Sequence, residues 1–198
     1  MCNNQYGRSM IEMLGVLSII GILSVGGLAG FSEVITRHRV NKTVEQVITM
    51  ASNLSQIGEQ SGSYEGLSND VAIRMKAISG GVSVSGSTLT NIFGGDITIE
   101  PSGLLATTDT EAFAMTYTGL SSDVCIRLAT QKWQSGQSGS LLGVGFAASE
   151  DGAASLKTSI ILNCAGVGCA KSLPISITDA ISLCNCSGDD CVMVVKYY

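Results

Sequence analysis

The stretch YGRSMIEMLGVLSIIGILSVGGLAGF, residues 6 to 31, is the most distinctive part of this sequence of 198 residues. From Met13 to Phe31 it carries no charged side chain. As a helix this run would be about 28 Å long, close to the thickness of the hydrocarbon core of a bilayer. One carboxylate, Glu12, stands at its entrance. A lone carboxylate at the edge of hydrocarbon is costly, so its presence there needs a functional explanation.

The chain after the apolar run continues with a helical pattern. No Pro or Gly interrupts residues 31–57, and apolar side chains recur there at helical spacing. The sequence therefore predicts one helix of about 45 residues, apolar in its first half and amphipathic in its second. A cleaved signal peptide would give no reason for this continuity. The face expected to contact the rest of the protein comprises Val44, Val47, Ile48, Ala51 and Leu54.

The charge composition excludes one class of partner. The net charge is −5 and charged residues make up 14% of the chain, whereas about 25% is usual. Beyond residue 42, acidic residues outnumber basic ones, although nucleic-acid binding needs clustered Lys and Arg, so no nucleic-acid partner is expected. Arg37, Arg39 and Lys42 come after the apolar run, and by the positive-inside tendency they would favour a cytoplasmic location for the rest of the chain.

The cysteines instead favour an oxidising compartment outside the cytoplasm. Six of the seven lie in the second half of the chain, and an even number there is typical of a disulfide framework in an oxidising compartment; the alternative is a set of reduced, buried thiols. Six cysteines allow 15 pairings. Cys164 and Cys169 are close enough in sequence to close a small loop. The six are Cys125, Cys164, Cys169, Cys184, Cys186 and Cys191.

The second half of the chain is expected to form short helices and strands, arranged as an antiparallel sheet on the amphipathic part of the long helix. Helices are predicted over residues 68–81, after Ser122 as the N-cap, and over residues 179–184 with Thr178 as the N-cap. A strand-like region is predicted around the Gly94–Gly95 turn, including Ile92, Ile97 and Ile99. Further strands are predicted over residues 113–119, 141–149, 156–164 and 192–198.

No pattern in the sequence indicates catalysis, a cofactor or a metal. Cys184, Cys186 and Cys191 have a spacing that zinc could use, but no fourth ligand is evident. His38 is the only histidine and has no GxSxG motif to accompany it. The carboxylate pairs Glu150–Asp151 and Asp189–Asp190 are more typical of solvated turns than of calcium sites. We therefore expect neither an enzyme nor a metal site.

A glycine followed by four residues and then a glutamate, at the start of such an apolar run, resembles the processing site of type IV pilins. The resemblance implies that prepilin peptidase cleaves between Gly7 and Arg8 and methylates the new N-terminus, so that Glu12 becomes the fifth residue of the mature chain. It also suggests why the carboxylate is there. The terminal amine of one subunit would meet Glu12 of a neighbour, and pairing of this kind is strongest where water is excluded.

Three further stretches resemble the type IVb group, in particular the toxin-coregulated and conjugative thin-pilus pilins. They are NIFGGDITI (91–99), TYTGLSSDVCIRLA (116–129) and SLCNCSGDDCVMVVKYY (182–198). In that group a cysteine of a short helix pairs with one near the C-terminus, which implies Cys184 as the partner of Cys125, with Cys186 as the next choice. A Cys186–Cys191 bridge would then remain. The implied fold is α+β, with the long helix packed on an antiparallel sheet and a disulfide-bonded C-terminal region.

The resemblance divides the chain into a leader peptide (1–7), an apolar transmembrane and assembly helix (8–31), its amphipathic continuation (32–58) and a globular head (59–198). It implies the major subunit of a type IV pilus, held in the bacterial inner membrane before assembly and extracellular afterwards, for adhesion, aggregation or conjugation. Expected partners are copies of itself, prepilin peptidase, an inner-membrane assembly platform and membrane lipid. The alternatives are a minor pilin, a type II secretion pseudopilin, or a single-pass anchored binding domain that does not polymerise.

Overall fold

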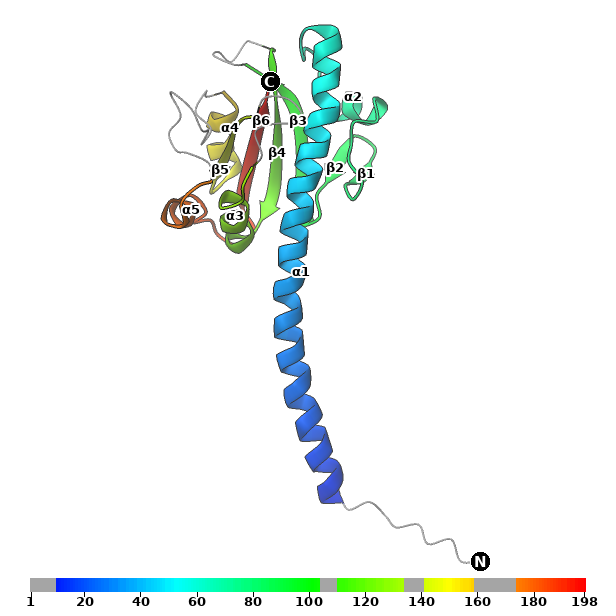
Figure 1. Cartoon of the computed structure of the whole chain (residues 1–198), viewed down its shortest axis with the longest axis vertical. Helices are drawn as coiled ribbons and strands as arrows, with labels where there is room; N and C mark the ends of the chain where they lie inside the picture. Colours follow the sequence, from blue (N-terminus) through cyan, green and yellow to red (C-terminus); the bar gives the residue numbers. More distant parts are fainter. Residues whose placement is uncertain (1–9, 104–109, 134–140, 159–173) are drawn as a thin grey trace, which may run out of the picture. The chain divides into compact units, whose positions relative to one another are not determined.

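The computed structural model of the chain describes residues 10–103, 110–133, 141–158 and 174–198 (Figure 1). They divide into two compact units, the first ending at His38 and the second beginning at Arg39. Helix α1 (Met10–Ser61) supplies the described part of the first unit and the first element of the second. The prediction of one continuous helix is confirmed, and with 52 residues this helix is longer than expected.

The second unit combines short helices with one sheet, as the predicted α+β fold requires. After α1 its helices are α2 (Asn69–Arg74), α3 (Ser122–Ala129), α4 (Glu150–Thr158) and α5 (Ile177–Leu183). Its strands are β1 (Ser83–Ser85), β2 (Thr88–Thr90), β3 (Asp96–Ser102), β4 (Ala112–Leu120), β5 (Leu141–Ala147) and β6 (Cys191–Tyr197).

In the described residues the strands form one antiparallel sheet in the order β1-β2-β3-β4-β6-β5. The last strand in sequence, β6, therefore lies between β4 and β5. Phe113 of β4 faces Tyr197 of β6, and Val144 of β5 faces Val195 of the same strand. All seven residues of β6 are buried, as expected for a central strand covered on both faces.

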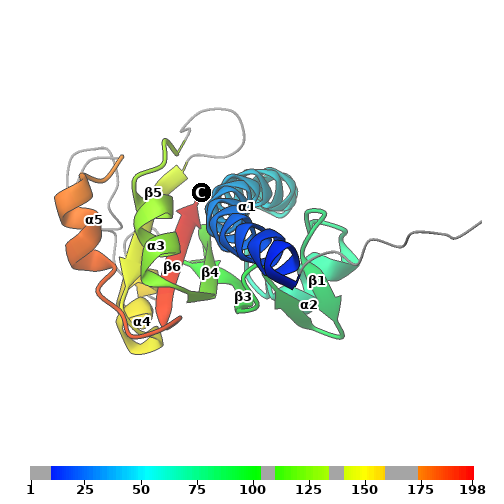
Figure 2. The same ribbon diagram turned by 90° about the horizontal axis from the view of Figure 1, so that it is seen from below.

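The two faces of the sheet have different coverings (Figure 2). The part of α1 in the second unit and helix α3 pack on one face, where Met50 and Leu54 join Ile97, Met115 and Val195 in the main core. Helix α4 packs on the other face in a smaller cluster of Ala114, Ala153, Val192 and Val194. Each large aliphatic side chain buried from α1 contributes about 2 kcal/mol of transfer free energy.

The face of α1 that contacts the sheet differs in part from the predicted one. Val47, Ala51 and Leu54 are fully buried, but Val44 and Ile48 are only partly buried. The stripe that does pack is rotated and also includes Val40, Thr43, Gln46 and Met50. Two hydrogen bonds lower the cost of burying the polar members of this stripe: Thr43 Oγ1 donates to the Arg39 carbonyl at 3.0 Å, and Gln46 Nε2 donates to the Gly80 carbonyl at 3.2 Å. Gln46 Oε1 has no partner among the described residues.

The helix predicted over residues 68–81 is much shorter than expected, since α2 ends at Arg74. Lys76 adopts a left-handed conformation with φ of 55°. The Ala77 N–H then donates to the Ala72 carbonyl at 2.9 Å, and the Lys76 N–H donates to the Ile73 carbonyl at 3.0 Å. This is a Schellman-type end formed without the usual glycine, which is why no stop signal is visible in the sequence at this point.

The strand predicted over residues 156–164 is wrong where it can be compared, because residues 156–158 form the last turn of α4. Ser149 Oγ accepts a hydrogen bond from the Gly152 N–H at 3.3 Å, and two acidic residues occupy the first turn, both of which favour a helix start. Residues 159–164 lie outside the described residues. The strands predicted over 113–119, 141–149 and 192–198 are confirmed as β4, β5 and β6, with bounds shifted by up to two residues.

Both predicted N-caps are displaced. Helix α3 is capped by Ser121, whose side chain makes no capping hydrogen bond, and the Ser122 hydroxyl instead donates to the Cys184 carbonyl at 2.6 Å. Helix α5 begins two residues before the predicted position, and its cap is Ser176, which accepts from the Asp179 N–H at 3.2 Å, so Thr178 lies inside the helix. Each error arises because neighbouring Ser and Thr residues compete for the same role.

The Gly94–Gly95 segment forms a tight turn before β3, held by one amide. Asn91 Oδ1 accepts from the N–H groups of Phe93 and Gly95 at 2.8 and 3.3 Å, and Asn91 Nδ2 donates to the Thr118 carbonyl at 2.9 Å. A Cβ atom on Gly95 would overlap that carbonyl, so only glycine fits there. Ile92 lies in this turn and not in the predicted strand, and the short hairpin β1–β2 before it was not expected at all.

Candidate functional site

The first unit is an apolar helix with an exposed surface. Within the described residues α1 is the one helix whose length and composition would suffice to cross a membrane; its most apolar window has a mean hydropathy of 2.1, and none of that window is buried. Leu14, Leu17 and Ile20 are each more than half exposed. In a single chain in water, such a surface would be strongly unfavourable, because burial of each large aliphatic side chain is worth about 2 kcal/mol. The surface therefore requires lipid or other protein around it.

Glu12 is exposed and is the acidic residue of the first turn of α1. The next charged residue in the helix is Glu33. The partial positive charge of the helix N-terminus favours a carboxylate at this position. Gly7 and Arg8, the predicted cleavage site, lie outside the described residues.

The polar side chains inside the apolar part of α1 are satisfied by the helix itself. Ser18 Oγ donates to the Leu14 carbonyl and Ser24 Oγ donates to the Ile20 carbonyl, each at 2.8 Å. Hydroxyls bonded in this way carry no unsatisfied donor into an apolar environment. They contrast with Glu12, whose charge the helix can only partly compensate.

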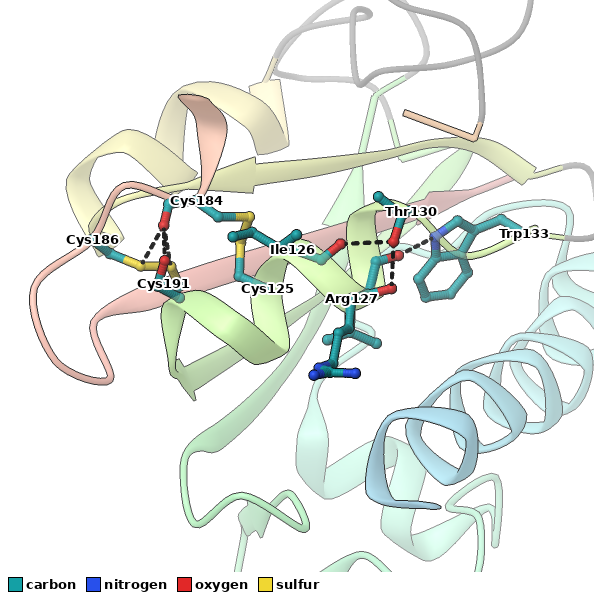
Figure 3. The surroundings of a disulfide bond; sticks show 10 residues. Cys125, Ile126, Arg127, Thr130, Trp133, Cys184, Cys186 and Cys191 are labelled. Carbon is teal, nitrogen blue, oxygen red and sulfur yellow. Dashed lines mark hydrogen bonds between the residues drawn. A yellow bond between two sulfur atoms is a disulfide. The ribbon is translucent and has the colours of Figure 1, made fainter. Parts of the chain in front are cut away.

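A disulfide joins α3 to the end of α5 (Figure 3). Cys125 is bonded to Cys184 with a Cα–Cα distance of 5.7 Å, across 59 positions of sequence, and both side chains are fully buried. The Ser122 hydroxyl donates to the Cys184 carbonyl at 2.6 Å and links the same two helices. The disulfide thus attaches the segment that precedes β6 to a helix packed on the sheet.

A second disulfide begins two residues after Cys184. Cys186 is bonded to Cys191 with a Cα–Cα distance of 5.4 Å, closing the turn that enters β6. Figure 3 shows both of its sulfur atoms beside the Cys184 carbonyl oxygen, at 3.4 and 3.7 Å. With these four cysteines oxidised, the three cysteines considered for zinc have no free thiolate. Within the described ranges no group of three His, Cys, Asp or Glu side chains could hold a metal ion. Cys164 and Cys169 fall outside those ranges.

The helix that carries Cys125 is also fixed at its C-terminal end. Trp133 Nε1 donates to the Leu128 carbonyl at 3.0 Å, and Thr130 Oγ1 donates to the Ile126 carbonyl at 3.0 Å (Figure 3). Trp133 is only 6% exposed. The same carbonyls also accept backbone N–H groups, Ile126 from Thr130 and Leu128 from Gln131, so each side chain adds a second hydrogen bond at the end of α3. Sequence inspection did not identify this role for Trp133, whose position just after a helix was the available signal.

Three groups of the sheet have shifted pKa values, and burial explains each shift. Burial raises the pKa of Tyr117, and it raises the pKa of Tyr197 to about 12. Burial also lowers the pKa of Lys196, whose side chain is 2% exposed in the central strand β6. Desolvation is the main cause in each case, and these groups belong to the packed sheet and not to an open cleft, so they do not form the kind of site in which catalytic groups are tuned.

Comparisons with known proteins bear on this arrangement. The family model described as "PilS N terminal" matches residues 37–194, which is most of the chain. The crystal structure of a type IVb pilin from Salmonella typhi matches with a TM-score of 0.52 and 20% sequence identity, covering 79% of this chain and 98% of that one. At this identity the match speaks for the fold alone. A search of curated proteins finds no match.

The family match and the fold agree with the long helix, the antiparallel sheet and the C-terminal disulfides. Pilins are structural proteins without enzymatic activity, so the expectation that this chain is not an enzyme is confirmed by its family. The chain belongs to the PilS family of type IV pilins, the structural subunits of type IV pili, and its fold is that of a type IVb pilin.

Proposed function

We propose that this chain is the major pilin of a type IV pilus, cleaved after Gly7 and polymerised through α1 into an extracellular filament. The observation that carries this proposal is the exposed apolar surface of α1 with a single carboxylate, Glu12, in its first turn. Copies of the same helix would bury that surface in the filament core. Before assembly, lipid of the inner membrane would cover it.

The proposed role of Glu12 is to set the register between subunits. Cleavage before Arg8 creates a terminal amine four residues from Glu12 in the same chain. In a filament core the amine of the incoming subunit would pair with Glu12 of its neighbour. Both charges are expensive in an apolar environment when unpaired, so only the matching axial position would be stable. The satisfied hydroxyls of Ser18 and Ser24 impose no such constraint.

The proposed boundaries are derived from these roles. Residues 1–7 are a leader removed by prepilin peptidase, residues 8–31 form the transmembrane and assembly helix, residues 32–58 continue it, and residues 59–198 form the head. An inner-membrane platform would extract the subunit from lipid and add it to the fibre. The two disulfides in the described part of the head suit a protein that works in an oxidising compartment outside the cell.

The test compares Glu12→Gln with Ser18→Ala in cells that carry the pilus machinery. Removing one partner of a buried charge pair costs about 3–5 kcal/mol, so Glu12→Gln should reduce filament yield by roughly 100-fold or more. The Ser18→Ala protein should assemble normally, since its hydroxyl bonds only within its own helix. Membrane-fraction blots check that both monomers accumulate. Normal pili from Glu12→Gln would refute the register role.

Mass spectrometry of sheared surface fractions distinguishes the alternatives. A chain that begins at Arg8 with a methylated amine, as the main component of the fibre, is the expected result. The same processed chain at trace abundance would favour a minor pilin or a type II secretion pseudopilin. An unprocessed chain that never enters a fibre would mean an anchored binding domain.

A further inference from the structure

A cavity of about 440 Å³ lies in the second unit at the C-terminal end of α1. Its walls come from the last turns of α1, from the segment just after them, from the start of β4 and from the end of β6. The side chains relevant to binding are Ser55, Glu59, Tyr64, Glu111 and Tyr198. The register role proposed for Glu12 does not involve any of them.

The cavity is negatively polarised. The described residues that line it include no Lys, Arg or His, but they include two exposed glutamates, Glu59 and Glu111. Neither carboxylate makes an ion pair or a hydrogen bond in the part of the chain that the structure describes. The last turn of α1 carries no basic residue, so the partial negative charge of the helix C-terminus adds to that of the carboxylates. The two carboxylates and the C-terminal end of α1 lie at the same cavity, and together they favour a positively charged ligand.

Two buried hydroxyls line the same cavity. Ser55 and Tyr64 are 5% and 6% exposed. Ser55 Oγ lies near the Tyr64 hydroxyl but makes no well-formed hydrogen bond within the described part of the chain. Burial is the main reason why the pKa of Tyr64 is raised; the neighbouring Ser55 hydroxyl opposes this rise and Glu59 adds to it. A buried hydroxyl with unused acceptor capacity is unusual, and it is explained if a donor occupies the cavity.

The position of the Tyr64 ring is determined by packing. The ring lies against Phe113 with a centroid distance of 4.9 Å, and its other side is next to α1 at Gly58. A Cβ atom at position 58 would overlap the Tyr64 ring, so the glycine provides the space that the ring occupies. The phenol oxygen is therefore held at the cavity by the packing of its ring.

We propose that this cavity binds an organic cation, a primary ammonium or a guanidinium group. Such a group carries several donors and no acceptor. It would donate to the Glu59 and Glu111 carboxylates and to the oxygen of Ser55 or Tyr64, while its alkyl stem contacts the rings of Tyr64 and Tyr198. Aromatic faces favour cations as well as alkyl chains. The cation comes either from a free small molecule or from a Lys or Arg side chain of another copy.

The test uses the full chain as a monomer in detergent micelles and two matched probes. N-acetyl-lysine methylamide carries the ammonium, and N-acetyl-norleucine methylamide has the same stem without charge. Ligand-observed NMR titrations measure both. The lysine probe should bind in a salt-dependent way, and the norleucine probe should bind at least about tenfold more weakly. Equal binding of the two probes, or no binding of the lysine probe, would overturn the proposal and leave a water-filled crevice.

Substitutions test whether the lysine probe binds in this cavity. Glu59→Gln combined with Glu111→Gln should reduce binding of the lysine probe at least about tenfold. Glu65→Gln changes a nearby exposed glutamate that does not line the cavity, and it should leave binding unchanged. Ser55→Ala retains both charges and should weaken binding several-fold. Unchanged Trp133 fluorescence shows that each variant is folded, and undiminished binding by the folded double variant would refute the site.

The two sources of the cation are distinguished in assembled filaments, an experiment that rests on the proposed polymerisation. If another subunit supplies the cation, filaments should fail to bind the lysine probe that monomers bind. If the ligand is a free molecule, filaments and monomers should bind it alike. The monomer titrations do not depend on assembly, so the cavity can be refuted while the pilin function stands, and the reverse is also true.

Discussion

Loss of the Cys125–Cys184 disulfide should destabilise the second unit far more than loss of the Cys186–Cys191 disulfide. The matched variants are Cys125→Ala with Cys184→Ala, and Cys186→Ala with Cys191→Ala. Both remove one bridge and two sulfur atoms, but the bridges span 59 and 5 positions of sequence. A cross-link restricts the unfolded chain more when it closes a longer loop.

The loop lengths set the expected difference. Chain entropy predicts about 4 kcal/mol for the long loop and about 2 kcal/mol for the short one. Both Cys125 and Cys184 are fully buried, so the first variant also leaves a small cavity that costs on the order of 1 kcal/mol more. For a chain of this size, 1 kcal/mol corresponds to roughly 2–4 °C in melting temperature. The first variant should therefore melt at least about 10 °C lower than the parent, and the second about 4–8 °C lower.

Trp133 provides the assay. It is the only tryptophan in the sequence, it is buried, and its Nε1 donates to the Leu128 carbonyl at the end of the helix that carries Cys125. Its fluorescence, measured during urea and thermal unfolding of the full chain in mild detergent, reports on the second unit without the signal of the apolar part of α1. Circular dichroism in parallel checks that α1 stays helical in both variants.

The role of loop length is tested by which of the two variants loses more stability. Equal losses of stability, or a larger loss from the short bridge, would mean that loop closure in the unfolded chain does not account for stabilisation by the disulfides. A loss below about 1 kcal/mol for the long bridge would mean that packing and the Ser122–Cys184 hydrogen bond already hold the two helices together.

Three other changes test the packing described above. In urea unfolding, Gly95→Ala should destabilise the second unit by about 2–4 kcal/mol, because a Cβ there would overlap a carbonyl of β4. Gly80→Ala should be nearly neutral, because a Cβ at that position meets nothing within 4 Å. Ser176→Ala should cost about 1 kcal/mol as the loss of the α5 cap, and Thr178→Ala much less, again by urea unfolding. Because the pKa of Tyr197 is raised, the folded state keeps a proton that the unfolded state loses between about pH 10 and 12. Stability should therefore fall as the pH rises through this range. Melting curves of Tyr197→Phe should show a smaller fall.

Much of the fold was predictable because its signals are local. Apolar residues without Pro or Gly over residues 31–57 make α1 continuous, and short apolar runs identify the central strands β4 and β6. The ends of the short helices were less predictable. Lys76 ends α2 in a left-handed conformation that any sequence rule would assign to glycine, and Ser121 and Ser176 compete with neighbouring hydroxyls as caps.

The candidate site, too, was predictable only in part. The position of Glu12 at the start of an apolar helix is evident from the sequence, whereas its partner in a filament is a matter of assembly. The cavity at the end of α1 could not have been predicted, because Glu59, Glu111 and Tyr198 are far apart in sequence and meet only when β4 and β6 pair beside the helix.

The long helix with its uncharged run from Met13 to Phe31 follows from the sequence alone, because length, hydropathy and periodicity depend on neighbouring residues. Which stripe of that helix is buried depends on the fold of the whole second unit. Thr43 and Gln46 enter the core while Val44 and Ile48 stay partly exposed, since the hydrogen bonds to the carbonyls of Arg39 and Gly80 lower the cost of burying polar groups. The cost is not removed entirely, because Gln46 Oε1 has no partner among the described residues. A periodic pattern predicts burial from the polarity of each side chain alone. Whether a polar side chain is buried also depends on whether the fold offers it a hydrogen-bond partner.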